Sequence, residues 1–523
     1  MRLFPRRSIP VRRLAHLMLA CWLLTGSSLA RTFQDAGEVA AAVAQLRSVL
    51  ADGTSEQRRS AIEYLAAYGG SEALDLVADA LGDPDPYVAD EAQLQVTEFG
   101  ADGALKLLLG RRGIGSRDRR VRLRAAEAIG RIYEPVDAET VLSRVRDKDV
   151  ELAMTLLWSL ERLIERDSIT GKKERTIKSV RMRTGRGDND RIRARAMQVL
   201  SLLDPYDGAI SADNLRVDCG LETAACLMDT FQRLQPVGYL GALHRGLEHE
   251  NPAVRLRAID VLLRKLAIRP TLDAFVHRLE NEPRAAIRRR LVEGLQLFTG
   301  EPLEDAPAEW RAYVSALPSA WSSGDAPRLP IPPQKVAGGM DVLTTLEPES
   351  DRLAILLDVS QSLWAGTSSE LNLLDLITPE IERLLGRVDQ SGTFYLLPFG
   401  DRPHPWSECP VEASAANVEA ALAYLRTGLA ARTSKSEGCN LHAAIEAALA
   451  HQDIDRIVVI TGSSFYVGEH ANVPLMVKLF EERTRFRPAI FDFVLLGVTE
   501  PGPASWAQLT SARGGTLFDV ILK

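Results

Sequence analysis

The amino-acid sequence predicts a multi-domain protein, in which an all-α helical solenoid is followed by a doubly wound, Rossmann-like α/β domain. Two observations predict this fold class. A motif recurs about every 30 residues over the first 300 residues, and apolar strands alternate with helices from Asp351 onwards. The length of 523 residues is enough for more than one core, and 46% hydrophobic with 25% charged residues is typical of globular proteins.

Residues 1–30 have the composition of a signal peptide. Five arginines and no acidic residue precede the apolar run Leu14–Leu24, and Ser28 and Ala30 are small residues suited to a cleavage site. The run is shorter than the roughly 20 residues of a membrane span, so no integral membrane segment is expected after signal removal. The run continues past Cys21, which disfavours a lipoprotein anchor. We expect an exported protein, either periplasmic or secreted to the cell envelope or beyond.

Residues 31–300 repeat a short motif. It begins with a polar turn, continues with a β-branched residue or leucine that an arginine often follows, and ends with a small residue on the same helical face. Its clearest copies are GDPDPYVADEA (82–92), VRLRA (121–125), IRARA (192–196) and VRLRA (254–258). With weaker copies included, the small or apolar position recurs 29 to 42 residues apart, at Ala61, Ala92, Ala125, Met154, Ala196, Ala225, Ala258 and Leu291. Helix pairs with such a period bury their apolar stripes by stacking, which predicts a solenoid. The motifs resemble HEAT repeats of the short bacterial type, and the resemblance implies a scaffold that binds proteins.

One interval, from Met154 to Ala196, spans 42 residues, and the excess falls in residues 168–190. This segment has little helical periodicity and is expected to be a loop. Residues 162–195 contain 12 basic and 5 acidic residues. Such a run usually forms a solvated surface; the alternatives are contact with an acidic partner, an anionic surface or the acidic C-terminal domain. The basic candidates are Lys172, Lys173, Arg175, Lys178, Arg181 and Arg183.

Seven of the 27 prolines lie in residues 301–335, so residues 301–337 are predicted to be a proline-rich linker to a domain at 338–523. Helices separate the strands of that domain, a pattern typical of a mostly parallel sheet with both faces covered. Such sheets bind ligands at the carboxyl ends of their strands. The expected strands are 353–359, 393–399, 456–461, 490–498 and 516–522.

The first expected strand ends in a D-x-S-x-S pattern, formed by Asp358, Ser360 and Ser362. This pattern resembles the metal-ion-dependent adhesion site of von Willebrand factor A-type domains, which implies Mg²⁺ held by hard oxygen ligands. The resemblance also implies a threonine and a second aspartate, but Cys439 and Gly462 stand at those positions. A thiol is a soft ligand and one carboxylate is lost, so the site is degenerate. We expect no cofactor, with Mg²⁺ as the alternative. Candidates for partner contact are Cys439, Asn440, Thr461 and Ser463.

The sequence therefore predicts a non-enzymatic scaffold for protein–protein interaction or adhesion. The net charge of −7 argues against nucleic-acid binding. The alternatives are a Mg²⁺-dependent adhesion or ligand-binding protein and a thiol-dependent enzyme at Cys439 with His442 nearby. No P-loop, G-x-S-x-G or H-E-x-x-H motif is present. A Cys219–Cys226 disulfide remains open, whereas Cys409 is expected to be too far from Cys439 for a disulfide.

Overall fold

The structure is a computed structural model that describes residues 36–523 except 146–147, 186–188, 265–266, 324–334, 340–344, 347–349, 361–372, 429–437, 453, 463–465, 488, 498–501, 514 and 521–523. The predicted signal peptide with Cys21, the proline run 327–333, Ser362 and Ser463 lie outside the described residues. In the described part of the chain, every helix is too short or too polar to cross a bilayer.

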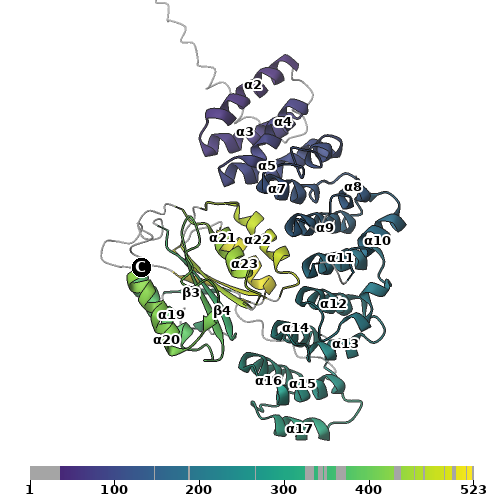
Figure 1. Cartoon of the computed structure of the whole chain (residues 1–523), viewed down its shortest axis with the longest axis vertical. Helices are drawn as coiled ribbons and strands as arrows, with labels where there is room; N and C mark the ends of the chain where they lie inside the picture. Colours follow the sequence, from purple (N-terminus) through teal and green to yellow (C-terminus); the bar gives the residue numbers. More distant parts are fainter. Residues whose placement is uncertain are drawn as a thin grey trace, which may run out of the picture.

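The N-terminal region is a curved stack of helices, and the C-terminal domain lies on its concave side (Figure 1). Consecutive inner helices pack on one another along the stack. These inner helices are α3 (Ser55–Tyr68), α5 (Pro86–Gln95), α7 (Arg119–Ile129), α9 (Val150–Glu165), α11 (Asp190–Leu203), α12 (Leu221–Leu234), α14 (Pro252–Leu263) and α16 (Ala285–Thr299). The other helices of the stack are α2 (Ala36–Asp52), α4 (Ser71–Asp79), α6 (Lys106–Leu108), α8 (Ala138–Leu142), α10 (Lys173–Arg181), α13 (Tyr239–Gly246), α15 (Arg269–Asn281) and α17 (Pro307–Ala316). Short 3₁₀ or π turns cover Ala80–Gly82, Val96–Phe99, Ala101–Leu105, Gly208–Ile210 and Ala212–Asn214.

The repeated sequence motif corresponds to the start and the buried face of each inner helix. The eight small or apolar positions lie one on each inner helix, and all are buried. The polar residue of the motif is a helix N-cap whose side-chain oxygen accepts a hydrogen bond from a backbone N–H two or three residues later, at Thr54, Asp85, Asp118, Asp149, Asn189 and Asn251. Each such cap contributes about 1 kcal/mol. The polar residue of the motif thus caps the helix, and the small or apolar residue that follows it packs in the core.

The predicted basic loop is partly helical. Helix α10 lies within it and buries Thr176 and Val180, and it packs on α8 and α11. The short apolar face is hidden in the sequence by the charged residues around it. This helix is on the outer side of the stack, away from the C-terminal domain (Figure 1), so the predicted loop does not dock on that domain through α10. Within the wider basic run 162–195, however, Arg195 on α11 does bind the C-terminal domain, through Glu482. The same segment contributes β2 (Ile169–Thr170), which pairs in parallel with β1 (Val136–Asp137).

The predicted linker, residues 301–337, is structured at both ends. Helix α17 packs on α15 and buries Trp310, whose indole N–H donates to the carbonyl oxygen of Glu304 at 2.9 Å. Strand β3 (Lys335–Gly338) pairs in parallel with β9 (Leu517–Val520) in the C-terminal sheet. The proline count was a poor guide here because Pro307 occupies the first turn of α17, where proline is favoured.

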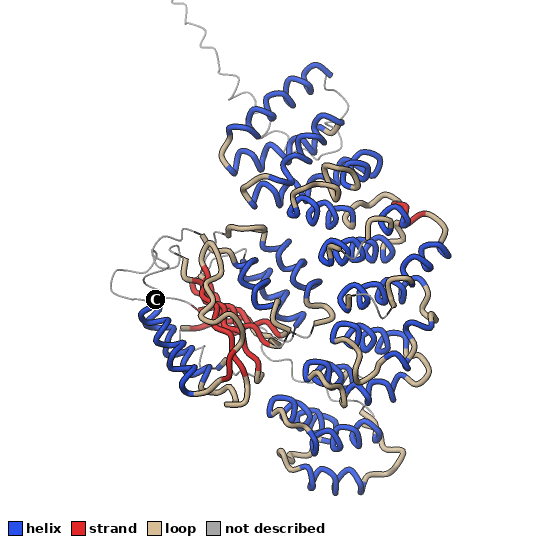
Figure 2. Tube along the Cα trace, viewed as in Figure 1, coloured by secondary structure: helices blue, strands red, loops and turns tan. Residues whose placement is uncertain are grey.

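In its described residues, the C-terminal domain is a seven-stranded sheet with helices on both faces (Figures 1 and 2). The strand order is β3-β9-β8-β7-β4-β5-β6, and β6 pairs antiparallel with β5. Helices α19 and α20 cover one face, while α21, α22 and α23 cover the face towards the solenoid. The remaining bounds are β4 (Arg352–Asp358), β5 (Thr393–Phe399), β6 (Val411–Glu412), β7 (Arg456–Thr461), β8 (Ile490–Leu496), α19 (Leu373–Leu385), α20 (Ala415–Ala423), α21 (Leu441–Leu449), α22 (Val473–Arg483) and α23 (Gly502–Arg513), with a π turn at Tyr424–Gly428.

The strand order creates a switch point between β4 and β7. The chain runs from β4 to β5 on one side and from β7 to β8 on the other, so the connections diverge at this pair of strands. A crevice outside the carboxyl ends of such strands is where open α/β sheets bind ligands. Every residue of β4 and β7 is buried, which explains the unbroken apolar runs 353–357 and 457–460 between the polar ends of these strands.

The four cysteines of the described region are free thiols. Cys226 is buried and its thiol donates to the carbonyl oxygen of Ala194 at 3.1 Å, while Cys219 Sγ lies 3.9 Å from His249 Nε2. The Cys219–Cys226 disulfide that the sequence left open is therefore not formed in this structure.

Candidate functional site

The candidate site is built on Asp358, which ends β4 at the switch point. Its Oδ2 accepts a hydrogen bond from the hydroxyl of Thr461, the last residue of β7, at 2.7 Å. Its Oδ1 accepts a hydrogen bond from the backbone N–H of Ser360 at 2.9 Å. All three residues are buried. Burial raises the pKa of Asp358 above its ordinary value, while hydrogen bonds from Ser360, Thr461 and Cys439 act against that shift.

Two of the predicted contact residues, Thr461 and Cys439, come together with Asp358. The Cys439 Sγ lies 3.9 Å from Thr461 Oγ1 and is fully buried. Burial and the neighbouring Asp358 carboxyl raise the pKa of this thiol well above its ordinary value. Asn440 has a structural task that the sequence did not reveal, because its side-chain oxygen caps α21 at Ala443 and its amide donates to the carbonyl oxygen of Asp401.

The described donor set fits Mg²⁺ poorly. It has a single carboxylate, and both oxygens of Asp358 already accept hydrogen bonds from the protein. Cys439 offers a soft thiol, and Gly462 offers no side chain. Over the described residues, three or more His, Cys, Asp or Glu side chains nowhere gather in a geometry suited to a metal ion.

His442 follows Cys439 closely in the sequence but packs elsewhere. Its ring lies 5.5 Å from the Phe480 ring and 5.0 Å from the His470 ring, measured between centroids. Burial, with a smaller contribution from His470, lowers the pKa of His442 to about 3. The cluster at the strand ends is thus a set of buried, hydrogen-bonded polar groups around a protonated thiol, which is suited to holding the strand ends in place rather than to nucleophilic attack.

The solenoid holds the segment that follows the strand ends. The backbone N–H of Tyr466 donates to Tyr87 Oη at 3.1 Å. Asp90, on α5, accepts hydrogen bonds from the backbone N–H groups of Ala471 and Asn472, both at 2.7 Å. The His470 Nδ1 also lies 2.7 Å from an Asp90 carboxylate oxygen. Asp90 therefore places a buried negative charge at the N-terminus of α22, where the helix dipole favours it.

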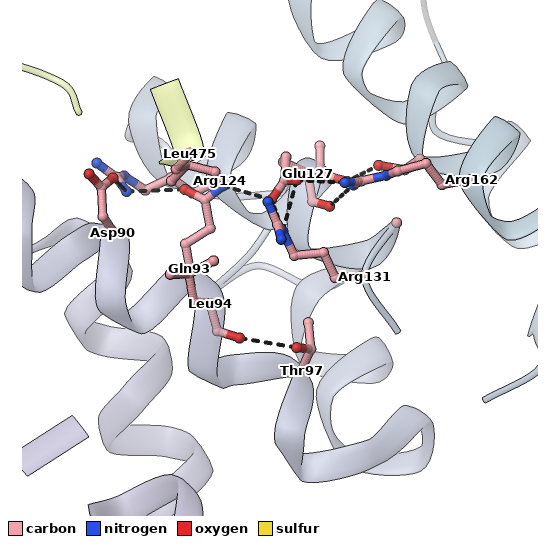
Figure 3. A network of polar contacts seen from close by, with 12 residues as sticks. Asp90, Gln93, Leu94, Thr97, Arg124, Glu127, Arg131, Arg162 and Leu475 are labelled. Atoms are coloured by element: carbon pink, nitrogen blue, oxygen red, sulfur yellow. Dashed lines mark hydrogen bonds and ion pairs between the residues drawn. The ribbon is translucent and has the colours of Figure 1, made fainter. Parts of the chain in front are cut away.

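Asp90 belongs to a ladder of ion pairs between inner helices (Figure 3). In each pair an arginine binds an acidic residue 34 or 35 positions earlier, on the preceding inner helix. The pairs are Arg124–Asp90 at 2.5 Å, Arg162–Glu127 at 2.8 Å and Arg195–Glu161 at 3.0 Å. Burial alone would raise the pKa of Asp90, but His470 and Arg124 lower it below its ordinary range.

Two arginines of the ladder also bind the C-terminal domain. Arg124 donates to the carbonyl oxygen of Glu469, just before α22. Arg195 binds the Glu482 carboxylate at 2.7 Å and its carbonyl oxygen at 3.0 Å, near the end of α22. Phe486 completes the contact, because it is buried in the solenoid core and lies under the Arg195 guanidinium. The sequence contained the signal for these arginines, since both occupy the fourth position of the V-R-L-R-A type motif.

The chain matches no protein-family model and no curated protein. Among solved structures, a similar chain is proximal thread matrix protein 1 from the mussel byssus, in its second crystal form. The two chains are 15% identical over 32% of this chain and 41% of that chain, with a TM-score of 0.26. The match thus spans less than half the length of the mussel protein.

Proposed function

We propose that this protein is an exported, non-enzymatic scaffold that combines a HEAT-like solenoid with an A-type domain and binds a protein partner at the strand ends without a metal ion. The observation that carries the proposal is the Asp358–Thr461 hydrogen bond across the switch point. This bond joins the carboxyl ends of β4 and β7 and gives the Asp358 carboxylate a hydrogen-bond donor from the protein itself. No cation is therefore needed to hold these two strand ends together.

The same geometry weighs against the two alternatives. A thiol-dependent enzyme needs a thiolate and an oriented base, whereas Cys439 is fully buried with a raised pKa and His442 packs on Phe480. A Mg²⁺-dependent adhesion protein needs more negative charge than the single Asp358 carboxylate supplies.

Metal independence predicts that Asp358→Asn is tolerated. Asparagine keeps an acceptor oxygen, and it removes a carboxylate whose raised pKa makes the ionised form costly in the folded state. Because that pKa is raised, the stability linked to Asp358 is full below pH 4 and is lost as pH rises through the folded-state pKa. We expect the melting temperature of Asp358→Asn at pH 7 to equal or exceed that of the wild type, with no effect of Mg²⁺ on either protein.

A matched control is Asp492→Asn, on β8. Asp492 is also fully buried, but its carboxylate binds Arg456 at 2.6 Å, so its loss should cost about 3 kcal/mol. For partner binding, a photo-cross-linking residue at the exposed Asp401, beside the strand ends, should capture a defined partner in EDTA. The same residue at the exposed Glu419, on α20, should not. A Mg²⁺-induced rise in melting temperature that Asp358→Asn abolishes would contradict the proposal.

A second contact, with an anionic lipid surface, is favoured by the outer side of the solenoid. Lys172, Lys173, Arg175 and Lys178 are exposed on or beside α10, and Met182 is 67% exposed at its end. Arg181 binds Asp204 and Asp207, which flank Tyr206, and this tyrosine is 96% exposed. Basic side chains together with exposed apolar and aromatic ones are typical of protein surfaces that bind at a membrane interface.

Charge reversal at Lys172, Lys173 and Arg175 should weaken sedimentation with phosphatidylglycerol vesicles. Each basic residue near such a surface contributes about 1 kcal/mol, so a loss of tenfold or more in binding is expected at low salt. Charge reversal at the exposed Lys106, Arg111 and Arg117 changes the net charge equally on other repeats and should have little effect. Equal losses in both variants would leave only a solvated surface at α10.

A further inference from the structure

The strand-end cluster and the solenoid are linked through one short segment. Cys439, which contacts Thr461, forms a parallel bridge with Tyr466, and its carbonyl oxygen accepts a hydrogen bond from Val467 at 3.1 Å. The backbone N–H of Tyr466 in turn donates to Tyr87 on α5. The chain of contacts from Asp358 to the solenoid therefore passes through Thr461, Cys439 and Tyr466.

The far end of this segment is fixed by a buried carboxylate. Asp90 accepts hydrogen bonds from Ala471, Asn472 and Arg124 and contacts His470, and its side chain is 1% exposed. A carboxylate in this position cannot leave its donors without being solvated or protonated, because the surroundings have a low dielectric constant. The segment 466–472 is thus held at both ends by residues of α5.

Helix α22 transmits the same constraint to the sheet. Its start is held by Asp90 and its end by Arg195 through Glu482, while Met476, Val477 and Phe480 pack in the sheet core. The solenoid contact and the strand-end surface therefore belong to one packed unit, in which a shift of α22 changes the support of both.

We propose that Tyr87 and Asp90 are positioning residues for the strand-end surface, so that partner binding there and release of the solenoid from segment 466–472 are coupled. Only the part of this inference that concerns partner binding rests on the proposed function; the contact between the solenoid and segment 466–472 does not. The contacts of Tyr87 and Asp90 with segment 466–472 act as an internal clamp. A partner that needs a different conformation of the strand ends must break these contacts.

The test uses the full chain and hydrogen–deuterium exchange read by mass spectrometry. Asp90→Asn and Tyr87→Phe should each raise amide exchange in peptides covering 438–445 and 466–472, by about tenfold for Asp90→Asn, with β4 and β5 unchanged. The control is Asp229→Asn, which removes the acid that binds Arg257 between α12 and α14, a more exposed pair whose hydrogen bonds join two inner helices among the described residues. It should leave both peptides unchanged.

The cross-linking yield at position 401 separates the outcomes. Coupling predicts that the yield changes at least about threefold in Asp90→Asn and not in Asp229→Asn. Unchanged exchange in Asp90→Asn and Tyr87→Phe overturns the clamp. Faster exchange with an unchanged yield overturns the coupling and leaves the proposed function intact. A wild-type protein that captures no partner overturns the proposed function, and the exchange data then still decide whether the clamp exists.

Discussion

Replacing Arg195 by alanine is expected to lower the free energy of unfolding by about 3–5 kcal/mol, because two carboxylates lose a shared cation in a buried site. Arg195 is 2% exposed and binds Glu161 at 3.0 Å and Glu482 at 2.7 Å. Its guanidinium also covers the ring of Phe486. The substitution removes one step of the inter-helix ladder and the anchor of α22 together, so both domains lose support at the same point.

Arg257→Ala is the matched control for this prediction. Arg257 occupies the same motif position and binds Asp229 at 2.5 Å on the preceding inner helix, but both side chains are at least 20% exposed. Its loss should cost no more than about 1 kcal/mol, as for other solvent-accessible pairs. Urea unfolding followed by circular dichroism and tryptophan fluorescence measures both variants. Equal losses would mean that the domain contact adds nothing to the stability of the chain.

The regular parts of the fold were predictable because their signals are local. Strands β4, β5 and β7 are buried on both faces, so they stand out in the sequence as short apolar runs. The inner helices stand out because a cap and a small buried residue recur together, as at Asp118 and Ala125. The helix α10 was missed because its buried face contains only Thr176 and Val180 between charged residues.

The candidate site was predictable in part, for a similar reason. Asp358 and Thr461 end adjacent parallel strands and Ser360 closely follows the first of them, so the topology brings the three together once the strands are known. The contact between the domains left no such signal. Asp90 and His470 are 380 residues apart in the sequence, and the local sequence pattern around either residue does not predict a contact with the other. The arginine at the fourth motif position was visible, but its partners depend on how the helices stack.

Acidification should destabilise the protein through His442, by about 2–3 kcal/mol between pH 6.5 and pH 4.5. Burial lowers the pKa of this ring to about 3, so the folded protein keeps it neutral while the unfolded chain binds a proton below pH 6.5. The stability that His442 contributes is therefore full above pH 6.5 and is lost as pH falls towards 3. The charged or titratable groups around the ring are His470, Glu469, Arg483 and Asp90.

His442→Phe isolates this contribution, because an aromatic ring preserves the packing on Phe480 and cannot bind a proton. The variant should show a shallower loss of unfolding free energy between pH 6.5 and pH 4.5, measured by urea unfolding at several pH values. The half-buried His244 and the buried His249 of the solenoid also have pKa values lowered by burial, and they add to the slope in both proteins. The test is therefore the difference in slope between His442→Phe and the wild type. His277→Gln, at an exposed solenoid position, should leave the slope unchanged. An identical slope in His442→Phe and the wild type would show that protonation of His442 does not limit stability in acid, and that the solenoid histidines or the Asp90 contact do so instead.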